Sequence, residues 1–182
     1  MKLVFFFLFI VIFSAVAETS RTTPVDMYLI IDGSASLKPG RDGAVQWLCD
    51  YAVDGILQDG DRLSVWLAAG TSQLLFSGTL GKQHSRESIK TLLRSIAVES
   101  AAADYAGAVR EASKLISQRG KRLSYTLLVS GSGGNAAAMA ERGEMAELLR
   151  YSRVREFAGW MAIIAAPGIG PRVRSAASAY MN

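Results

Sequence analysis

Three oxygen-bearing side chains follow the first apolar segment of the domain. The segment 27–31 (MYLII) is continuously apolar, and Asp32, Ser34 and Ser36 come directly after it. Such a run is typical of a strand buried on both faces. One carboxylate and two hydroxyls on a tight loop suit Mg²⁺, because this cation prefers oxygen ligands and retains several waters. The same residue types also bind backbone N–H groups in turns, so two interpretations stay open: a cation site or a capped turn.

A second candidate site follows a later apolar segment. The sequence 124–130 (SYTLLVS) runs into the glycine-rich stretch 131–135 (GSGGN), ahead of a predicted helix. A glycine loop in this position can bind phosphate through backbone N–H groups. It does not match G-x-G-x-x-G, and no G-K-[ST] occurs, so the pattern favours a turn.

The single histidine and the single cysteine argue against several kinds of site. His84 lies in a polar loop and the chain has no G-x-S-x-G motif, so a Ser-His-Asp hydrolase is not expected. One histidine and one cysteine are too few for a zinc centre. Cys49 has no partner for an internal disulfide and lies on the apolar side of a predicted helix, which indicates a buried thiol.

Strand-like and helix-like segments alternate and predict an α/β fold. The expected architecture is a Rossmann-like three-layer sandwich, with a mostly parallel central sheet and helices on both faces. Strands 62–69 and 73–80 are close in sequence and should form a hairpin, which adds one antiparallel edge strand. The other predicted strands are 27–32, 124–130 and 159–168. The predicted helices have apolar faces at 45–57, 89–96, 105–116 and 139–149, and a short helix starts at Pro171.

The N-terminal region predicts export. Lys2, the apolar run 3–13 and the small residues 15–17 have the order of a signal peptide, residues 1–17, cleaved after Ala17. The run is shorter than the about 20 apolar residues of a membrane span, and no later segment is long and apolar enough, so the mature chain has no predicted transmembrane segment. An uncleaved anchor is the alternative. The expected location is the periplasm, the cell envelope or the medium, with a bacterial source favoured because no N-x-S/T sequence occurs.

The rest of the chain is predicted to form one domain. Residues 18–25 are polar and are expected to be a short tether, and residues 26–182 form the domain. The net charge is +4, and the arginines are scattered among acids rather than gathered in a stripe. This distribution is typical of solvated helix faces and does not indicate nucleic-acid binding.

The D-x-S-x-S sequence at the end of a buried strand, followed by a helix and a hairpin, resembles the von Willebrand factor A (vWA) domain. The resemblance covers nearly all of residues 26–182 in the order of elements. It implies a protein-binding or adhesion module rather than an enzyme, with no organic cofactor. It also implies a metal-ion-dependent adhesion site, in which Asp32, Ser34 and Ser36 hold Mg²⁺ or Mn²⁺.

Two positions depart from the family pattern. Ala103 stands where the family has a threonine ligand, and Gly131 stands where it has an aspartate. Asp104, beside the threonine position, is a candidate additional ligand. The resemblance therefore implies a partly degenerate site. It also implies a ligand-binding face at the loops, made of Ala103, Asp104, Ser130, Gly131 and Ser132.

Two other functions stay open. One is a phosphate-ester or nucleotide enzyme that uses Asp32 and the 131–135 loop, although no general base is evident near Asp32. The other is a structural envelope protein with a vestigial site.

In addition, the family usually has one more strand and helix after the last predicted strand. The sheet edge between Gly159 and Ala166 is therefore expected to accept a partner strand or a second copy.

Overall fold

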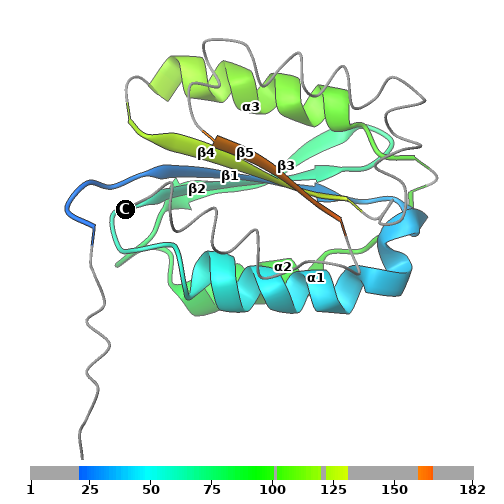
Figure 1. Cartoon of the computed structure of the whole chain (residues 1–182), viewed down its shortest axis with the longest axis horizontal. Coiled ribbons are helices and arrows are strands. Elements are labelled where there is room, and N and C mark those ends of the chain that lie inside the picture. The colour runs from blue at the N-terminus through cyan, green and yellow to red at the C-terminus, as the bar shows by residue number, and fades with distance from the viewer. Residues whose placement is uncertain (1–20, 101, 120–121, 131–159, 166–182) are drawn as a thin grey trace, which may run out of the picture.

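The computed structural model describes residues 21–100, 102–119, 122–130 and 160–165 (Figure 1). The predicted signal peptide, the glycine-rich 131–135 and the helices predicted at 139–149 and from Pro171 lie outside the described residues.

The described strands form one sheet with the order β3-β2-β1-β4-β5. Four are parallel, and β3 pairs antiparallel with β2, so the predicted α/β class and hairpin are confirmed. Their bounds are β1 (Asp26–Asp32), β2 (Arg62–Ala68), β3 (Ser72–Thr79), β4 (Ser124–Ser130) and β5 (Trp160–Ala165).

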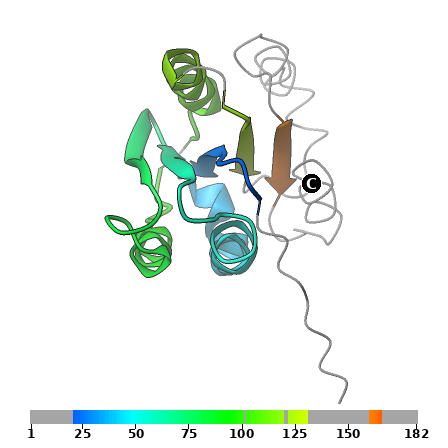
Figure 2. The ribbon, with the colours of Figure 1, turned by 90° about the vertical axis from the view of Figure 1, so that its left-hand side faces the viewer.

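Helices cover both faces of this sheet, as predicted. A 3₁₀ turn, η1 (Ala35–Gly40), leads into α1 (Arg41–Trp47), which continues as a π-helical segment, η2 (Leu48–Val53). The apolar stripe predicted from residue 45 is therefore carried by α1 and η2 together. Figures 1 and 2 show α1 and α2 (Arg86–Ser95) on one side of the sheet and α3 (Tyr105–Arg119) on the other.

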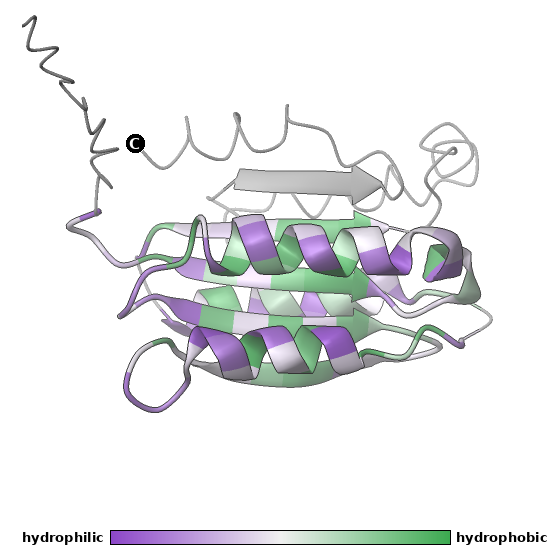
Figure 3. Cartoon of the chain, turned by 90° about the horizontal axis from the view of Figure 1, so that it is seen from below, coloured by the Kyte–Doolittle hydropathy of each residue, from purple (hydrophilic) through white to green (hydrophobic). Residues whose placement is uncertain are grey.

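The central strand β1 divides the core into two clusters. All seven residues of β1 are buried, as its continuous apolar run predicted. Met27, Leu29 and Ile31 face the cluster under α1, η2 and α2, whereas Tyr28 and Ile30 face the cluster under α3. Figure 3, seen from the side of α1 and α2, shows hydrophobic colour in the sheet and hydrophilic colour on the outer turns of the helices.

The chain just before β1 is fixed to the domain by a buried ion pair. Nη2 of Arg21 lies 2.6 Å from Oδ2 of Asp61, and the side chains are 8% and 1% exposed. Asp61 also accepts hydrogen bonds from the backbone N–H groups of Val25 and Gln58. Arg21 and Val25, which fall in the stretch predicted as a tether, therefore contact the residue that precedes the start of β2. In the part of the chain that is described, no helix has the length and apolarity that a membrane crossing requires.

Candidate functional site

The sheet topology places the end of β1 at a point where ligands are expected. β1 lies between β2 and β4. The helix that connects β1 to β2 covers one face of the sheet, and α3, which leads into β4, covers the other. In open α/β sheets, ligands bind beyond the carboxyl ends of the strands at such a switch point. Asp32 is the last residue of β1 and is fully buried.

The two serines fold back onto the Asp32 carboxylate. The Ser34 backbone N–H donates to Oδ1 of Asp32 at 2.7 Å, and the Ser36 hydroxyl donates to Oδ2 at 3.1 Å. The hydroxyl oxygens of Ser34 and Ser36 lie 2.7 Å apart. The tight curvature of η1, which begins at Ala35, brings Ser36 back toward the strand. Ser36 is exposed, so the cluster reaches solvent through this residue.

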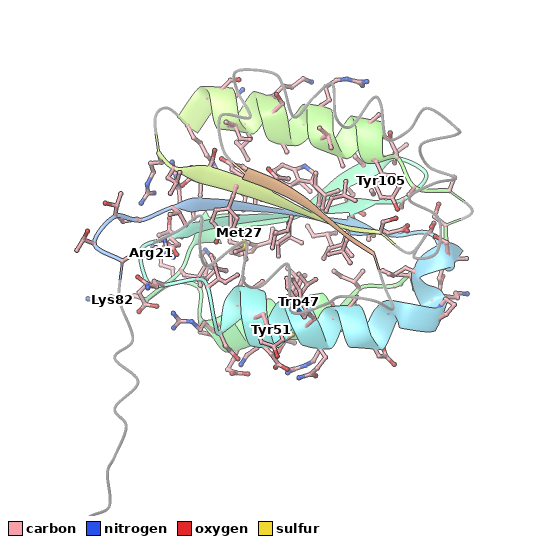
Figure 4. All side chains as sticks on the ribbon, viewed as in Figure 1. Arg21, Met27, Trp47, Tyr51, Lys82 and Tyr105 are labelled. Atoms are coloured by element: carbon pink, nitrogen blue, oxygen red, sulfur yellow. The ribbon has the colours of Figure 1, made fainter. Side chains whose placement is uncertain are left out.

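A tyrosine from α3 completes the cluster on the opposite side of the carboxylate. The Tyr105 hydroxyl donates to Oδ2 of Asp32 at 2.7 Å and lies 2.8 Å from the Ser130 hydroxyl at the end of β4. Tyr105 is the first residue of α3 and is 6% exposed. Figure 4 shows its side chain between α3 and the sheet. The spacing of apolar residues predicted only that Tyr105 lies on the apolar face of a helix, and it did not predict this hydrogen bond. The available signal was a hydroxyl on the first helical residue after Asp104, next to the position that the vWA resemblance compares with a metal ligand.

The loop before α3 lies against the loop after β1. Ala35 N–H donates to the Ser100 carbonyl at 2.8 Å, and Ser100 N–H donates to the Gly33 carbonyl at 3.1 Å. Asp104 N–H donates to the carbonyl of Ala69 after β2 at 2.8 Å. Backbone hydrogen bonds therefore join the loops after β1 and β2 to the loop that carries Ala103 and Asp104.

The Asp104 carboxylate is directed at its own helix. Its Oδ1 accepts a hydrogen bond from the Gly107 N–H at 2.8 Å, which makes Asp104 the N-cap of α3. Ala103 is half-buried and packs against the core cluster under α3. The structure thus brings Asp32, Ser34, Ser36 and Ser130 together, with Ala103 and Asp104 on the neighbouring loop. Gly131 and Ser132 lie outside the described residues.

The oxygen distances in this cluster are those of hydrogen bonds, and they are also compatible with neighbouring ligands of a small divalent cation. Adjacent ligands of an octahedral site with bonds of about 2.1 Å are separated by about 3 Å. The Ser34–Ser36 and Ser36–Asp32 oxygen distances are 2.7 and 3.1 Å. Among the described residues, no group of three or more His, Cys, Asp or Glu side chains could hold a metal ion. A cation here would therefore depend on hydroxyls and one carboxylate.

The other reactive residues of the described chain have packing roles. Cys49 is buried, as predicted, and burial raises the pKa of its thiol. His84 is half-buried, and its ring meets the edge of the Phe76 ring at a centroid distance of 5.0 Å. Neither residue is a partner in the hydrogen bonds of the Asp32 cluster described above.

Fold and site together define an open α/β domain with a polar cluster at the carboxyl edge of its sheet. No protein-family model matches the sequence, and no curated protein matches it. Solved structures do match. A von Willebrand factor type A protein from Catenulispora acidiphila has a TM-score of 0.60 at 14% identity, over 87% of this chain and 43% of that chain. The chain has the fold of the vWA domain, as the sequence predicted.

Two further structures of the same fold are metal-loaded. Manganese-loaded TRAP protein from Plasmodium vivax has a TM-score of 0.58 at 19% identity, over 86% of this chain and 63% of that chain. Proximal thread matrix protein 1 from the mussel byssus, with a zinc-occupied metal-ion-dependent adhesion site, has a TM-score of 0.51 at 18% identity, over 79% of this chain and 35% of that chain. The chain spans less than two thirds of the length of each of these three proteins.

Proposed function

We propose that this chain is an exported vWA-like module that binds another protein through the carboxyl edge of its sheet, without catalytic turnover. The loop face is the region at the carboxyl edge of the sheet around Asp32, Ser34, Ser36, Ala103, Asp104 and Ser130, with Gly131 and Ser132 added from the sequence; Asp32, Ser34 and Ser130 lie beneath its surface, and Ser36 is exposed on it. The observation that carries the proposal is the Asp32–Ser34–Ser36 cluster at the switch point, which reaches solvent at Ser36.

The proposal includes a weakly bound Mg²⁺ or Mn²⁺. Asp32, Ser34 and Ser36 would hold the ion, and waters or a carboxylate of the partner protein would fill its other positions. The gathering of the three oxygen-bearing side chains at one point supports this assignment, and so do the metal-loaded structures of two proteins of the same fold. We assign Asp104 to the loop face and not to the side chains that contact the ion, because its Oδ1 caps α3.

Thermal unfolding against cation concentration tests the site. A ligand that binds only the folded state raises stability in proportion to ln(1 + [L]/Kd). We expect the Tm of the exported chain to rise in millimolar Mn²⁺ and to fall back to its starting value when EDTA is added. We expect Asp32→Asn to abolish the rise. Asp42→Asn, at a side chain that is 92% exposed on α1, is the matched control. An identical response in the Asp32 variant would remove the cation from the proposal.

The two alternative functions give different results. An enzyme of phosphate-ester chemistry would hydrolyse a generic ester such as p-nitrophenyl phosphate, and Asp32→Asn would abolish the activity. The groups shown to donate to Asp32 are a backbone N–H and two hydroxyls, none of which is a strong general base. A structural envelope protein would show neither turnover nor a cation response.

A second contact surface is proposed at β5. This strand stands at one end of the order of described strands, and an uncovered edge offers unpaired backbone groups to another strand. We propose that residues 159–166 pair with a partner strand or a second copy. A concentration-independent monomer in light scattering would argue against self-association there.

A further inference from the structure

We propose that β3 is a dimerisation edge, which pairs antiparallel with β3 of a second copy about a twofold axis between Leu75 and Phe76. The inference goes beyond the proposed function, because it involves neither the loop face nor a cation, and it concerns the end of the strand order opposite to β5. No other described strand pairs with the outer edge of β3 (Figure 2). Such an edge offers a row of unpaired backbone N–H and C=O groups to another strand.

The β2–β3 hairpin lacks the side chains that normally prevent an edge from pairing with its own copy. Natural edge strands are protected by lysine, by other charged residues or by proline. No charged residue and no proline occur between Leu63 and Gly81, although 20% of the residues of the whole chain are charged. Two copies of an uncharged strand meet no like-charge repulsion when they lie side by side. The occupant that fits this edge is therefore a second β3.

The same strand carries apolar area that the domain leaves uncovered. Leu74 is 50% exposed, although its cross-strand neighbour Trp66 is only 3% exposed in the cluster under α3. Leu75 and Phe76 pack against the cluster under α1 and α2 but are only half-buried. Apolar surface gains free energy when it is removed from water. The three consecutive apolar residues therefore add a driving force to the backbone pairing.

A β-bulge makes β3 symmetrical about its centre. Val65 pairs with Phe76 and Trp66 pairs with Leu74, so Leu75 is the extra residue, and it faces the same side as Phe76. Directly opposite residues share a face, so the partners on β2 assign the other residues of β3. The residues on the side of α3 are Ser72, Leu74, Ser77 and Thr79, and those on the side of α1 and α2 are Gln73, Leu75, Phe76 and Gly78. The order of faces is the same from either end of the strand.

This symmetry selects one register for the pair of β3 strands. Leu75 lies opposite Phe76 of the second copy, and Leu74 lies opposite Ser77 of the second copy, so that all eight residues meet residues of their own face. A shift of one residue would set opposite faces against each other. The contact uses the same surface on both copies, so it closes as a dimer and does not continue into a filament. Leu75 and Phe76 of both copies meet at its centre, as an aromatic–aliphatic cross-strand contact.

Sedimentation velocity of the exported chain over a range of concentrations tests the association, with EDTA present so that no cation contributes. We expect a dimer whose population rises with concentration. Leu74→Lys places a charge on the edge twice in each twofold dimer, and it should raise the dissociation constant at least about tenfold. The matched control is Leu123→Lys, because Leu123 is also apolar and exposed, at 39%, but precedes β4. It should leave the dissociation constant unchanged.

Disulfide cross-linking tests the register itself. Leu74→Cys and Ser77→Cys chains are mixed and oxidised, because opposite residues of an antiparallel pair have Cα atoms about 5 Å apart, within disulfide range. We expect a cross-linked dimer from the mixture. We expect far less from Leu74→Cys alone, because its two copies lie about 10 Å apart along the strands. The unmodified chain controls for Cys49, which is buried.

The possible outcomes separate this inference from the proposed function. A monomer at every concentration would overturn the dimer at β3 and leave the loop face and its cation untouched. A dimer that Leu74→Lys does not weaken, and that gives no cross-link between positions 74 and 77, would also overturn the inference and assign the association to another surface, such as the β5 edge. If Leu74→Lys folds poorly, the cross-linking result alone decides.

Discussion

The carboxylate of Asp32 and the hydroxyl of Tyr105 lie 2.7 Å apart although 73 positions separate them in the sequence. Asp32 ends the central strand and Tyr105 begins the helix that crosses the opposite face from α1 and α2. This hydrogen bond ties the loop after β1 to the start of α3. The candidate site therefore has two sides: residues next to Asp32 in the sequence form one, and Tyr105 from a distant helix forms the other.

Loss of the Asp32 carboxylate should destabilise the fold. Asp32→Ala leaves the Ser34 N–H and the Tyr105 hydroxyl without their acceptor, and a buried unsatisfied polar group costs about 1–3 kcal/mol. We expect urea denaturation to give a free energy of unfolding lower by about 2–4 kcal/mol. Asp42→Ala, at an exposed position, should change it by less than about 0.5 kcal/mol. A loss no larger than that of the control would show that the cluster adds nothing to stability.

The N-terminus of α3 offers a double-mutant test. Asp104→Ala removes the cap from the Gly107 N–H and should cost about 1 kcal/mol. A Cβ added at Gly107 would lie 2.0 Å from Oδ2 of Asp104, so Gly107→Ala should displace the cap and offset its gain in helix propensity. In the Asp104→Ala background the clash is gone, and Gly107→Ala should raise stability by up to about 1 kcal/mol. Additive effects of the two substitutions would contradict the cap geometry.

The segment before β1 should contribute measurably to stability. Arg21→Ala leaves the buried Asp61 carboxylate without its ion-pair partner, and breaking a buried pair typically costs about 3 kcal/mol. Lys114→Ala removes a pair whose side chains are 60% and 48% exposed, and should cost less than about 0.5 kcal/mol. Chemical denaturation of both variants tests the difference. If Arg21→Ala behaves like Lys114→Ala, the segment does not help to hold β1.

The buried hydroxyl of Tyr125 should make the stability of the fold sensitive to alkaline pH. Burial raises the pKa of Tyr125 well above the ordinary value of 10.0, and its hydroxyl has no hydrogen-bond partner among the described residues. The folded state therefore keeps the proton while the unfolded chain loses it, so stability is fully present below pH 10 and falls as the pH rises above it. Tyr28, whose pKa burial also raises, adds to the same loss.

Tyr125→Phe is the direct test of that prediction. Removing an unsatisfied buried hydroxyl should raise stability at neutral pH by about 1 kcal/mol, and the fall above pH 10 should become less steep. Unfolding monitored by far-UV circular dichroism at several pH values measures both effects. A variant that is less stable at neutral pH would indicate that the hydroxyl has a partner beyond the described residues.

The sequence alone determined the parts of this protein that depend on neighbouring residues. The apolar run of β1, the short gap between β2 and β3, and the polar residues at alternate positions after β1 predicted a buried strand, a hairpin and the Asp32–Ser34–Ser36 loop. These features follow from side-chain alternation along a strand and from turn chemistry, which act over a few residues. The continuation of α1 as η2 was not visible in the spacing, because both helix types bury the same side of the segment.

Tertiary structure alone decided the chemistry around the carboxylate. Whether Asp104 or Tyr105 would reach Asp32 depended on how α3 begins over the sheet, and a shift of one residue rotates a helical side chain by about 100°. The structure directs Asp104 to the helix end and Tyr105 to the carboxylate. Likewise, the Ser130 hydroxyl joins the cluster because β4 pairs with β1 in parallel register. Contacts of this kind join residues far apart in the chain, and local propensity contains no information about them.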